Sequence, residues 1–325
     1  MSTSQKPKKH HFVPVCYLSK FLKRNFFYTL DIRKMQKGFN EYPRKNQPGK
    51  ICYIEDYYTI SEDYNDPQFS FDQYHDLFIE SDVLTRLENK YNDIYNKLTS
   101  SQFITLSEAK DFSDFIILMK LRNPYEEKIM RDKIPGLLDS SIDDAAEKMK
   151  DNPRYIALPD ELKRFLVDDI KERNRKDFHY PKKVLLFTLI SRHTAENNAK
   201  FQKEIVDSSW RILQAPINGP YFITSDNPGF SITSKDELIY NTKFIDDFSF
   251  YLPLSPNYCL LITDYDKDNC YSENLDRKNI GRFRASSQFV LFINDKSIQR
   301  VNQLLIACDD WYLRKIGEKN KPKSI

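Results

Sequence analysis

Cysteine, glycine and long apolar runs are all scarce in this 325-residue chain, and each shortage excludes something. No apolar stretch approaches the roughly 20 residues that a membrane-spanning helix needs, so the sequence predicts no membrane span and no membrane partner. The five cysteines are scattered and no Cys-x-x-Cys pair occurs, which is typical of reduced thiols in a cytoplasmic protein. No hydrophobic segment follows the basic N-terminal residues, so we expect no secretory signal.

Several motifs of known enzymes are also missing. With seven glycines, the chain has no G-x-x-x-x-G-K-[ST] phosphate loop, no G-x-G-x-x-G dinucleotide motif and no G-x-S-x-G nucleophile elbow. Asp264, Asp266 and Asp268 have the spacing of a calcium loop, but no glycine stands at its sixth position, so we interpret them as a solvated turn. The 50 basic and 47 acidic residues nearly balance, which argues against a dedicated nucleic-acid coat and leaves a local basic patch open.

Aromatic residues are abundant, with 23 Phe and 20 Tyr, and 40% of the residues are hydrophobic, enough for a sizeable core. Strand patterns lie toward both ends of the chain and helical patterns lie between them. This order predicts an α+β fold, with a mixed or antiparallel sheet formed by N- and C-terminal strands and a large central helical section. We expect one compact domain over residues 1–325, with a helical insertion at about 132–180 and flexible tails at 1–9 and 317–325.

The element predictions rest on hydrophobic periodicity. Residues 25–31 and 39–42 read as a β-hairpin, and 221–224 as a buried strand. Apolar residues at helical spacing predict long helices over 71–98 and 107–121. Near the C-terminus we predict a short helix over 274–284, a strand over 289–293, a helix over 297–308 and a closing strand over 311–316.

The most informative stretch is residues 220–229, PYFITSDNPG, in which a buried strand leads into a polar turn. Ser225, Asp226 and Asn227 follow the strand directly. A carboxylate and an amide at the mouth of a core strand are held rigidly, which is typical of binding and catalytic groups. The alternative is that Asp226 and Asn227 only form an Asx-turn ahead of Pro228.

Other candidate groups stand at the ends of predicted elements. His10 and His11 precede a short helix that begins near Pro14, and neutral imidazoles serve as metal ligands or as acid–base groups near pH 7. Because neighbouring side chains of an extended segment point in opposite directions, at most one of the two faces the Asp226 turn. The alternative is that one histidine caps a helix or packs under the core and the other is solvated.

Arg122 ends an apolar helix face, and its guanidinium suits a carboxylate or a phosphate. The alternative for Arg122 is a structural salt bridge to Asp226, which would leave no free site.

The order of motifs along the chain resembles one family. An H-H-x-V-P-x-x-Y-L-x-x-F start precedes a helix bounded by Glu80 and Glu88 and a helix that ends in L-R-x-P. The F-I-T-S-D-N-P segment, a P-L-S-P corner and a V-N-x-L-x-x-A helix over 301–307 follow. These features resemble the bacterial domain-of-unknown-function 4238 family over nearly the whole chain. The resemblance implies an architecture but no reaction, and it marks these motif positions: His10, His11, Pro14, Tyr17, Phe21, Arg122, Ser225, Asp226, Asn227 and Pro228.

Two hypotheses from different classes follow. In the first, which we favour slightly, the protein is a hydrolase of phosphodiester bonds in nucleic acid or nucleotides, with a toxin-like function in bacterial defence. Its catalytic residues would be His10, His11 and Asp226. Its substrate-binding residues would be Arg122, Asn227, Ser225 and Tyr17. His11 and Asp226 are candidate ligands of a divalent metal ion, whose presence the sequence leaves open. In the second, the protein is a non-catalytic module that binds a protein or nucleic acid, and the motif residues specify the fold.

Overall fold

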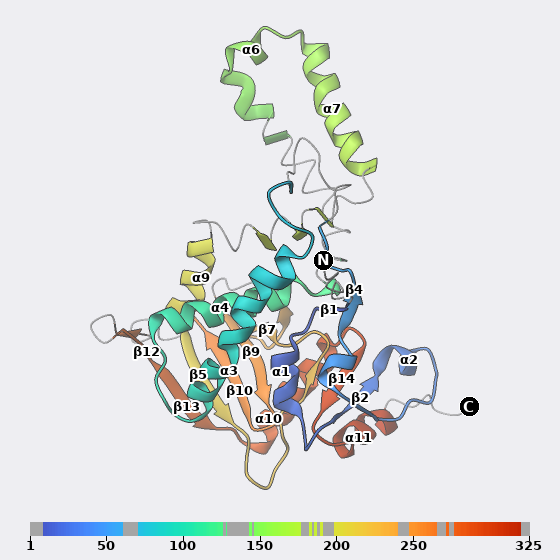
Figure 1. The fold of residues 1–325 in the computed structure, drawn as a ribbon, viewed down its shortest axis with the longest axis vertical. Helices are drawn as coiled ribbons and strands as arrows, with labels where there is room; N and C mark the ends of the chain where they lie inside the picture. Colours follow the sequence, from blue (N-terminus) through green and yellow to red (C-terminus); the bar gives the residue numbers. More distant parts are fainter. Residues whose placement is uncertain are drawn as a thin grey trace, which may run out of the picture.

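The computed structural model describes residues 9–60, 71–125, 128, 143–144, 146–176, 182–183, 185–186, 189–190, 198–239, 247–264, 271–272 and 276–319. These residues form two main β-sheets with helices packed against them (Figure 1). The predicted α+β class with mixed and antiparallel sheets is confirmed.

The larger sheet has six strands in the order β13-β5-β10-β9-β7-β8. Its strands are β5 (Ser209–Gln214), β7 (Phe230–Thr233), β8 (Leu238–Ile239), β9 (Phe248–Ser255), β10 (Tyr258–Thr263) and β13 (Ile280–Arg284). All neighbours are antiparallel except β13 and β5, which run parallel. Alternate residues face opposite sides: Leu260 and Ile262 pack in the main core, whereas Cys259 and Leu261 pack in a second cluster with Val290 and Ile293. The sheet is therefore covered on both faces.

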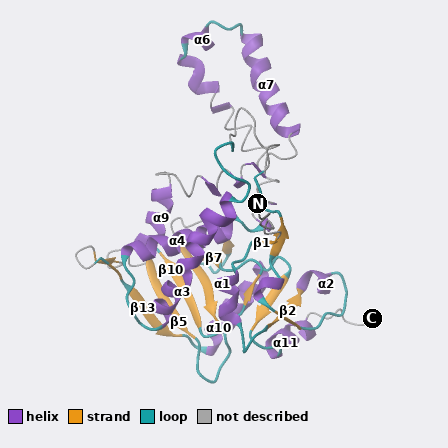
Figure 2. Ribbon diagram, in the orientation of Figure 1, coloured by secondary structure: helices purple, strands orange, loops and turns teal. Residues whose placement is uncertain are grey.

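Helices α3 (Thr85–Thr99) and α4 (Leu106–Leu121) cover the first of these faces (Figure 2). Thr105 and Glu108 form a capping box that starts α4, since each side chain bonds the backbone N–H of the other. Almost every side chain of α4 from Phe112 to Leu121 is buried, so this helix lies inside the molecule. Its Phe112 ring lies 6.0 Å from the ring of Trp210 on β5. Helix α9 (Asn198–Asp207) packs beside α4 and leads into β5.

The smaller sheet joins the two ends of the chain. Its strand order is β3-β2-β14-β6, with β2 (Phe27–Asp31), β3 (Arg44–Asn46), β6 (Thr224–Ser225) and β14 (Leu304–Ala307). Leu305 pairs with Leu30 on one side and with Ser225 on the other. Helices α2 (Ile32–Gln36), α10 (Ser287–Arg300) and α11 (Trp311–Lys319) adjoin it. This sheet places the SDNP turn, which follows β6, against the loop that precedes β14.

Shorter elements complete the body of the molecule. Strand β1 (Lys9–His11) pairs with β4 (Tyr53–Glu55), and helix α1 (Val15–Leu18) continues as the 3-10 turn η1 (Ser19–Phe21). A second 3-10 turn, η2 (Pro48–Lys50), precedes β4, and the pair β11 (Tyr271–Ser272) and β12 (Arg277–Lys278) precedes β13. A π-helical turn, η4 (Ile79–Leu84), runs directly into α3.

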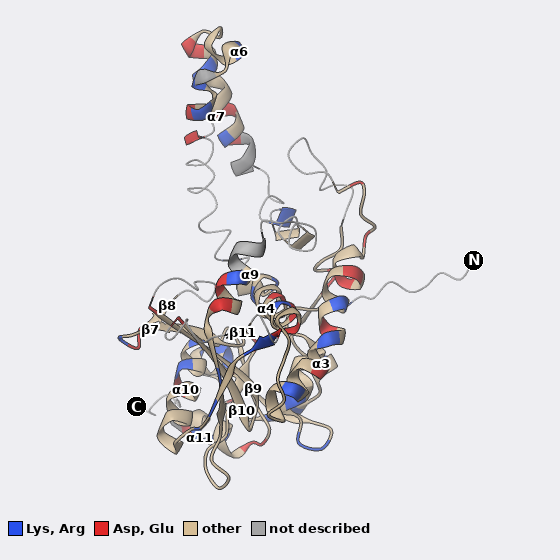
Figure 3. Ribbon diagram, turned by 90° about the vertical axis from the view of Figure 1, so that its left-hand side faces the viewer, with Lys and Arg blue, Asp and Glu red and all other residues tan. Residues whose placement is uncertain are grey.

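An arm projects from this body along the long axis of the molecule (Figure 1). It contains η5 (Met149–Asp151), α6 (Pro153–Ile156) and α7 (Asp160–Lys176), and it lies in the region of the predicted helical insertion. Charged residues of both signs are interspersed along it (Figure 3).

Several predicted elements in the last quarter of the chain were wrong. Residues 289–293 lie in helix α10, not in a strand, because Ser286 accepts a hydrogen bond from the backbone N–H of Phe289 and caps a helix. The buried positions Val290, Ile293, Asn294 and Ser297 then recur at helical spacing. Of the predicted helix over 297–308, only residues 297–300 are helical, as the end of α10. The family-derived helix over 301–307 is wrong, since 304–307 form strand β14. The predicted helix over 274–284 contains strands β12 and β13, and the predicted strand over 311–316 is helix α11.

Two predictions in the remaining chain also need correction. The partner of β2 is β3, not residues 39–42, because Asp31 accepts a hydrogen bond from the backbone N–H of Lys34 and starts helix α2 there. Of the predicted buried strand over 221–224, residues 222–224 are buried and Tyr221 is partly buried, but the ladder begins only at Thr224. Before Thr224, the Asn294 side chain bonds the backbone of Tyr221 and Ile223 and replaces a neighbouring strand.

Candidate functional site

The carboxylate of Asp226 faces the loop before β14. Its two oxygens accept hydrogen bonds from the backbone N–H groups of Asn302, at 3.0 Å, and Gln303, at 2.8 Å. Asp226 is 3% exposed. Burial raises its pKa to about 6, although the hydrogen bonds from this backbone and the charge of Arg33 act in the lowering direction.

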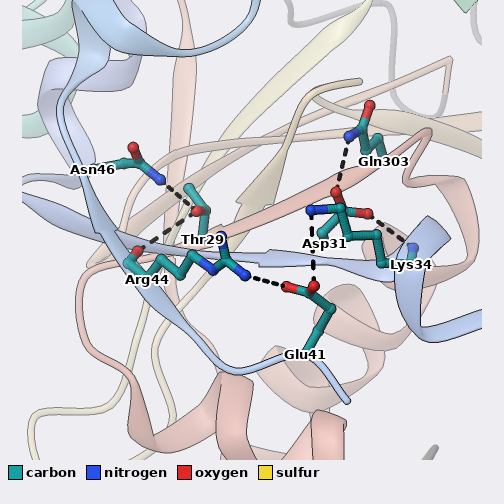
Figure 4. Close-up of polar contacts among 7 residues, drawn as sticks. All are labelled: Thr29, Asp31, Lys34, Glu41, Arg44, Asn46 and Gln303. Atoms are coloured by element: carbon teal, nitrogen blue, oxygen red, sulfur yellow. Dashed lines mark hydrogen bonds and ion pairs between the residues drawn. The ribbon is translucent and has the colours of Figure 1, made fainter. Parts of the chain in front are cut away.

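The loop that Asp226 binds is held from its other side by β2 (Figure 4). The Gln303 side chain donates to Asp31 at 2.9 Å, and the other carboxylate oxygen of Asp31 caps α2. On the same strand, Thr29 accepts from the side chain of Asn46 at 2.7 Å, which ties β2 to β3. Asp226 therefore closes a network that fastens the two ends of the chain together.

Asn227 is the centre of a second set of buried contacts. Its side-chain oxygen accepts from Lys120 Nζ at 3.1 Å, and its side-chain nitrogen donates to the carbonyl of Arg300 at 3.3 Å. Lys120, which is 1% exposed on α4, also donates to the carbonyl of Gly229 at 2.7 Å. The backbone N–H of Asn227 donates to Ser225 Oγ at 3.1 Å. The turn thus links α4 to the end of α10.

Two N-terminal motif residues are also engaged inside the protein. The Tyr17 hydroxyl donates to the carbonyl of Pro253 at 2.7 Å and shares a 2.7 Å hydrogen bond with Thr224 Oγ1, and burial raises its pKa. His10 is fully buried; its Nδ1 accepts from the backbone N–H of Tyr58 at 2.7 Å, and the two rings stack. The Tyr58 hydroxyl in turn donates to the carbonyl of Arg122 at 2.8 Å.

His11 and Arg122 belong to a different cluster, which we call the Glu80–Arg122 cluster and which comprises His11, Cys16, Glu80, Glu88 and Arg122. Arg122 is 2% exposed on its side chain, and its Nη1 lies 2.9 Å from Oε1 of Glu88. The ion-pair partner of Arg122 is thus Glu88, and the alternative of a salt bridge to Asp226 is wrong. The charge of Glu80 also acts on Arg122, and those of Glu88 and Arg122 act on His11 and Cys16.

The titratable groups of this cluster have unusual affinities for protons. Burial and the charge of Glu88 raise the pKa of Glu80 to about 7, although Arg122 acts in the lowering direction. Burial lowers the pKa of His11, and the charge of Arg122 lowers it further, although a backbone hydrogen bond to Gly49 and the charge of Glu88 oppose this. Burial raises the pKa of Cys16 to about 12, so its thiol is protonated at neutral pH and is a poor nucleophile.

Four buried polar atoms in and beside the cluster have no hydrogen-bond partner among the described residues: His11 Nε2, Glu80 Oε2, Arg122 Nε and Tyr91 Oη. Buried polar atoms without a hydrogen-bond partner are rare in folded proteins, so each one needs an explanation. A cavity of about 10 Å³ adjoins Glu88 and Arg122, which is room for about one water molecule. His11, Cys16, Glu80 and Glu88 are only partly buried, in contrast to the deeply buried arginine that Glu88 contacts.

The π-helical turn explains why Glu80 and Glu88 reach the same arginine. Residues eight positions apart on a regular α-helix differ by about 80° in direction. The wider i→i+5 turn of η4 accommodates an extra residue and reduces this difference. Neither glutamate was selected as a candidate site residue from the sequence. The signal was present, since Glu80 and Glu88 bound one of the helix motifs on which the family resemblance rests.

The candidate metal ligands His11 and Asp226 lie in separate networks. Within the described ranges, no group of three or more His, Cys, Asp or Glu side chains is arranged to hold a metal ion. Of the helices in the part of the chain that the structure describes, none has the length and apolar character needed to cross a membrane.

Fold and site together define an α+β protein with a buried SDNP network and, beside it, a partly exposed cluster of carboxylates, histidine and arginine. The chain belongs to the family described as "Protein of unknown function (DUF4238)", whose model matches residues 9–310, and this confirms the resemblance seen in the sequence. Searches of curated proteins and of solved structures gave no match.

Proposed function

We propose that this protein is a hydrolase of phosphodiester bonds in nucleic acid or nucleotides, and that the Glu80–Arg122 cluster is its active site. The observation that carries the proposal is the convergence of Glu80, His11 and Arg122, each with a buried polar atom that has no partner in the described part of the chain. Perturbed carboxyl and imidazole groups beside a buried arginine are typical of active sites.

Each of the three side chains supplies one requirement of the reaction. His11, with its lowered pKa, is neutral at pH 7 and accepts the proton of the attacking water. Glu80, with a pKa of about 7, is largely protonated just below neutrality and donates a proton to the departing oxygen. Arg122 is buried, so it stabilises the charge that develops on the phosphoryl oxygens through its electric field and not by contact, and Glu88 fixes its guanidinium.

The remaining motif residues hold the site in place in this proposal. His10 anchors Tyr58, whose hydroxyl binds the Arg122 carbonyl. Asn123, the next residue, donates to the carbonyl of Asp226 at 2.7 Å and so ties the end of α4 to the SDNP turn. Displacing these contacts would move Arg122 relative to His11 and Glu80.

Glutamine at position 80 tests the proposal directly. Purified wild-type protein and Glu80→Gln are assayed on RNA, single- and double-stranded DNA and dinucleotides, with Mg²⁺ and with a chelator in parallel. Loss of a positioned acid lowers the rate by about 10²- to 10⁴-fold. Asp93→Asn, an exposed position on the same helix, serves as the matched control and should keep full activity. Wild-type rates in Glu80→Gln would overturn the assignment.

A second candidate function, a non-catalytic binding module, is favoured by a specific observation. Buried hydrogen bonds tie Tyr17 to Thr224, Asn227 to Ser225 and the Arg300 carbonyl, and Asp226 to the Gln303 backbone, as residues that specify a fold do. This second function is preferred if the wild-type protein turns over no substrate, Asp226→Ala lowers the melting temperature by several degrees, and Glu80→Gln leaves partner binding unchanged.

A further inference from the structure

The projecting arm carries an unusual amount of exposed apolar surface. Six large apolar side chains on it are more than a third exposed: Met149, Ile156, Leu162, Phe165, Leu166 and Ile170. Phe165, at 64%, is the most exposed of them. Exposed apolar groups that gather on one element mark a site of interaction, whereas isolated ones need no explanation.

These side chains form a groove and a ridge. A groove of about 590 Å³ lies between the residues leading through η5 and α6 and one side of α7; Met149, Tyr155, Leu166 and Ile170 line it. Along α7, Leu162 and Phe165 are three residues apart and do not line the groove, so they make a ridge beside it. The ridge of one copy can fit into the groove of a second copy, so this surface suits contact between two identical chains.

The charges of α7 favour a second copy as the occupant. The first ten residues of the helix, DELKRFLVDD, contain four acidic and two basic residues, although Asp160 pairs with Lys163 at 2.9 Å, and its last six residues, KERNRK, contain four basic and one acidic residue. When two α7 helices run antiparallel, the acidic start of one lies beside the basic end of the other, and their helix dipoles also oppose. A membrane-surface helix would instead carry mainly basic residues on its polar face, whereas the arm mixes both signs (Figure 3).

We propose that the arm is a dimerisation element, in which two copies of this chain pair antiparallel through the face formed by α7 and the η5–α6 segment. Helix α7 has 17 residues and is thus about 26 Å long, and a two-helix face about 20 Å wide covers on the order of 500 Å² in each copy. A total of roughly 1,000 Å² lies at the lower limit for specific interfaces, so we expect a dissociation constant in the micromolar range. The inference is independent of the proposed hydrolase activity.

Sedimentation of the full chain from about 1 to 100 μM tests this. The wild-type mass should rise with concentration from 38.7 kDa toward twice that value. Phe165→Glu should weaken association at least tenfold and leave the melting temperature of the body unchanged. Ile217→Glu is the matched control, because Ile217 is 80% exposed on a loop of the body. Leu162→Glu provides a second disruption if Phe165→Glu does not fold.

The antiparallel arrangement has its own test. Glu161→Lys places a positive charge beside the basic end of the partner helix, so it should weaken the dimer, most at low salt. A wild-type chain that stays monomeric at 100 μM overturns the proposal, as does a dimer that Phe165→Glu and Leu162→Glu leave intact. Binding of the monomer to vesicles of neutral and anionic lipid, lost in Phe165→Glu, would also overturn it by assigning the groove to a membrane.

Discussion

Replacing Glu88 with glutamine probes the ion pair at the base of the Glu80–Arg122 cluster. The side chain of Arg122 is 2% exposed, and the pair is 2.9 Å long. Glutamine keeps the length of the side chain and a hydrogen-bond acceptor but removes the negative charge. The guanidinium stays protonated, because arginine does not lose its proton in proteins. A buried positive charge is then left with less compensation.

The expected loss in the free energy of unfolding follows from the burial of Glu88 and Arg122. Removing one partner of a buried ion pair costs about 3 to 5 kcal/mol. Because the Glu88 side chain is 27% exposed and Glu80 supplies another negative charge, we expect a smaller loss, about 2 to 3 kcal/mol. The unfolding entropy of a 325-residue chain converts 1 kcal/mol to about 1.5 °C, so the melting temperature should fall by about 3 to 5 °C.

Calorimetry at two pH values makes the test specific. The fall should be larger at pH 5, where Glu80 is protonated, than at pH 8, where its carboxylate compensates Arg122. Asp93→Asn on the exposed side of α3 should change the melting temperature by less than about 1 °C. A similarly small change in Glu88→Gln, or no dependence on pH, would refute the reasoning. Combining Glu88→Leu with Arg122→Met should recover much of the loss, because the buried charge is then absent.

Three further predictions concern buried groups. Tyr17→Phe removes both hydrogen bonds of a fully buried hydroxyl and leaves their acceptors unpaired, so the free energy of unfolding should fall by about 1 to 3 kcal/mol in denaturant titrations. Gly229→Ala should lower the melting temperature, because Gly229 has φ +74° and a Cβ there would lie 2.8 Å from Phe250 Cζ. The folded-state pKa of Glu80, about 7, lies above its ordinary value of 4.5, so Glu80 should add about 1 kcal/mol of stability as the pH falls from 8 to 6. Glu80→Gln should lose this contribution and keep the smaller rise that comes from Asp226, whose pKa is raised to about 6.

Matched substitutions at less buried positions control for the effect of the substitution type itself on stability. Tyr28→Phe, at a partly buried tyrosine on β2, should change the free energy of unfolding by less than about 0.5 kcal/mol. Gly49→Ala adds a Cβ with no heavy atom within 4 Å and should be nearly neutral. Equal losses in a test variant and its control would contradict the corresponding prediction.

The amino-acid sequence by itself determined the fold class, the family and much of the core. Helix α4 was predicted because its capping residues and its apolar run lie within one continuous segment. The C-terminal elements were predicted poorly, because short apolar runs such as 289–293 and 304–307 suit a helix or a strand equally well. For 304–307 the outcome depended on the open position between β2 and β6, which other parts of the chain create.

The candidate site was predicted only in part for a related reason. The sequence identified His11 and Arg122, which stand at the ends of elements, but it grouped them with Asp226. Only the tertiary structure decided that Asp226 faces the 302–303 backbone and that Arg122 faces Glu88. Local patterns show which residues are buried, but the partner of a buried polar group is set by contacts between distant segments, such as Tyr17 and Thr224, 207 positions apart. Because a buried charge or hydroxyl must be compensated where it lies, its function depends on which distant segment the fold brings to it.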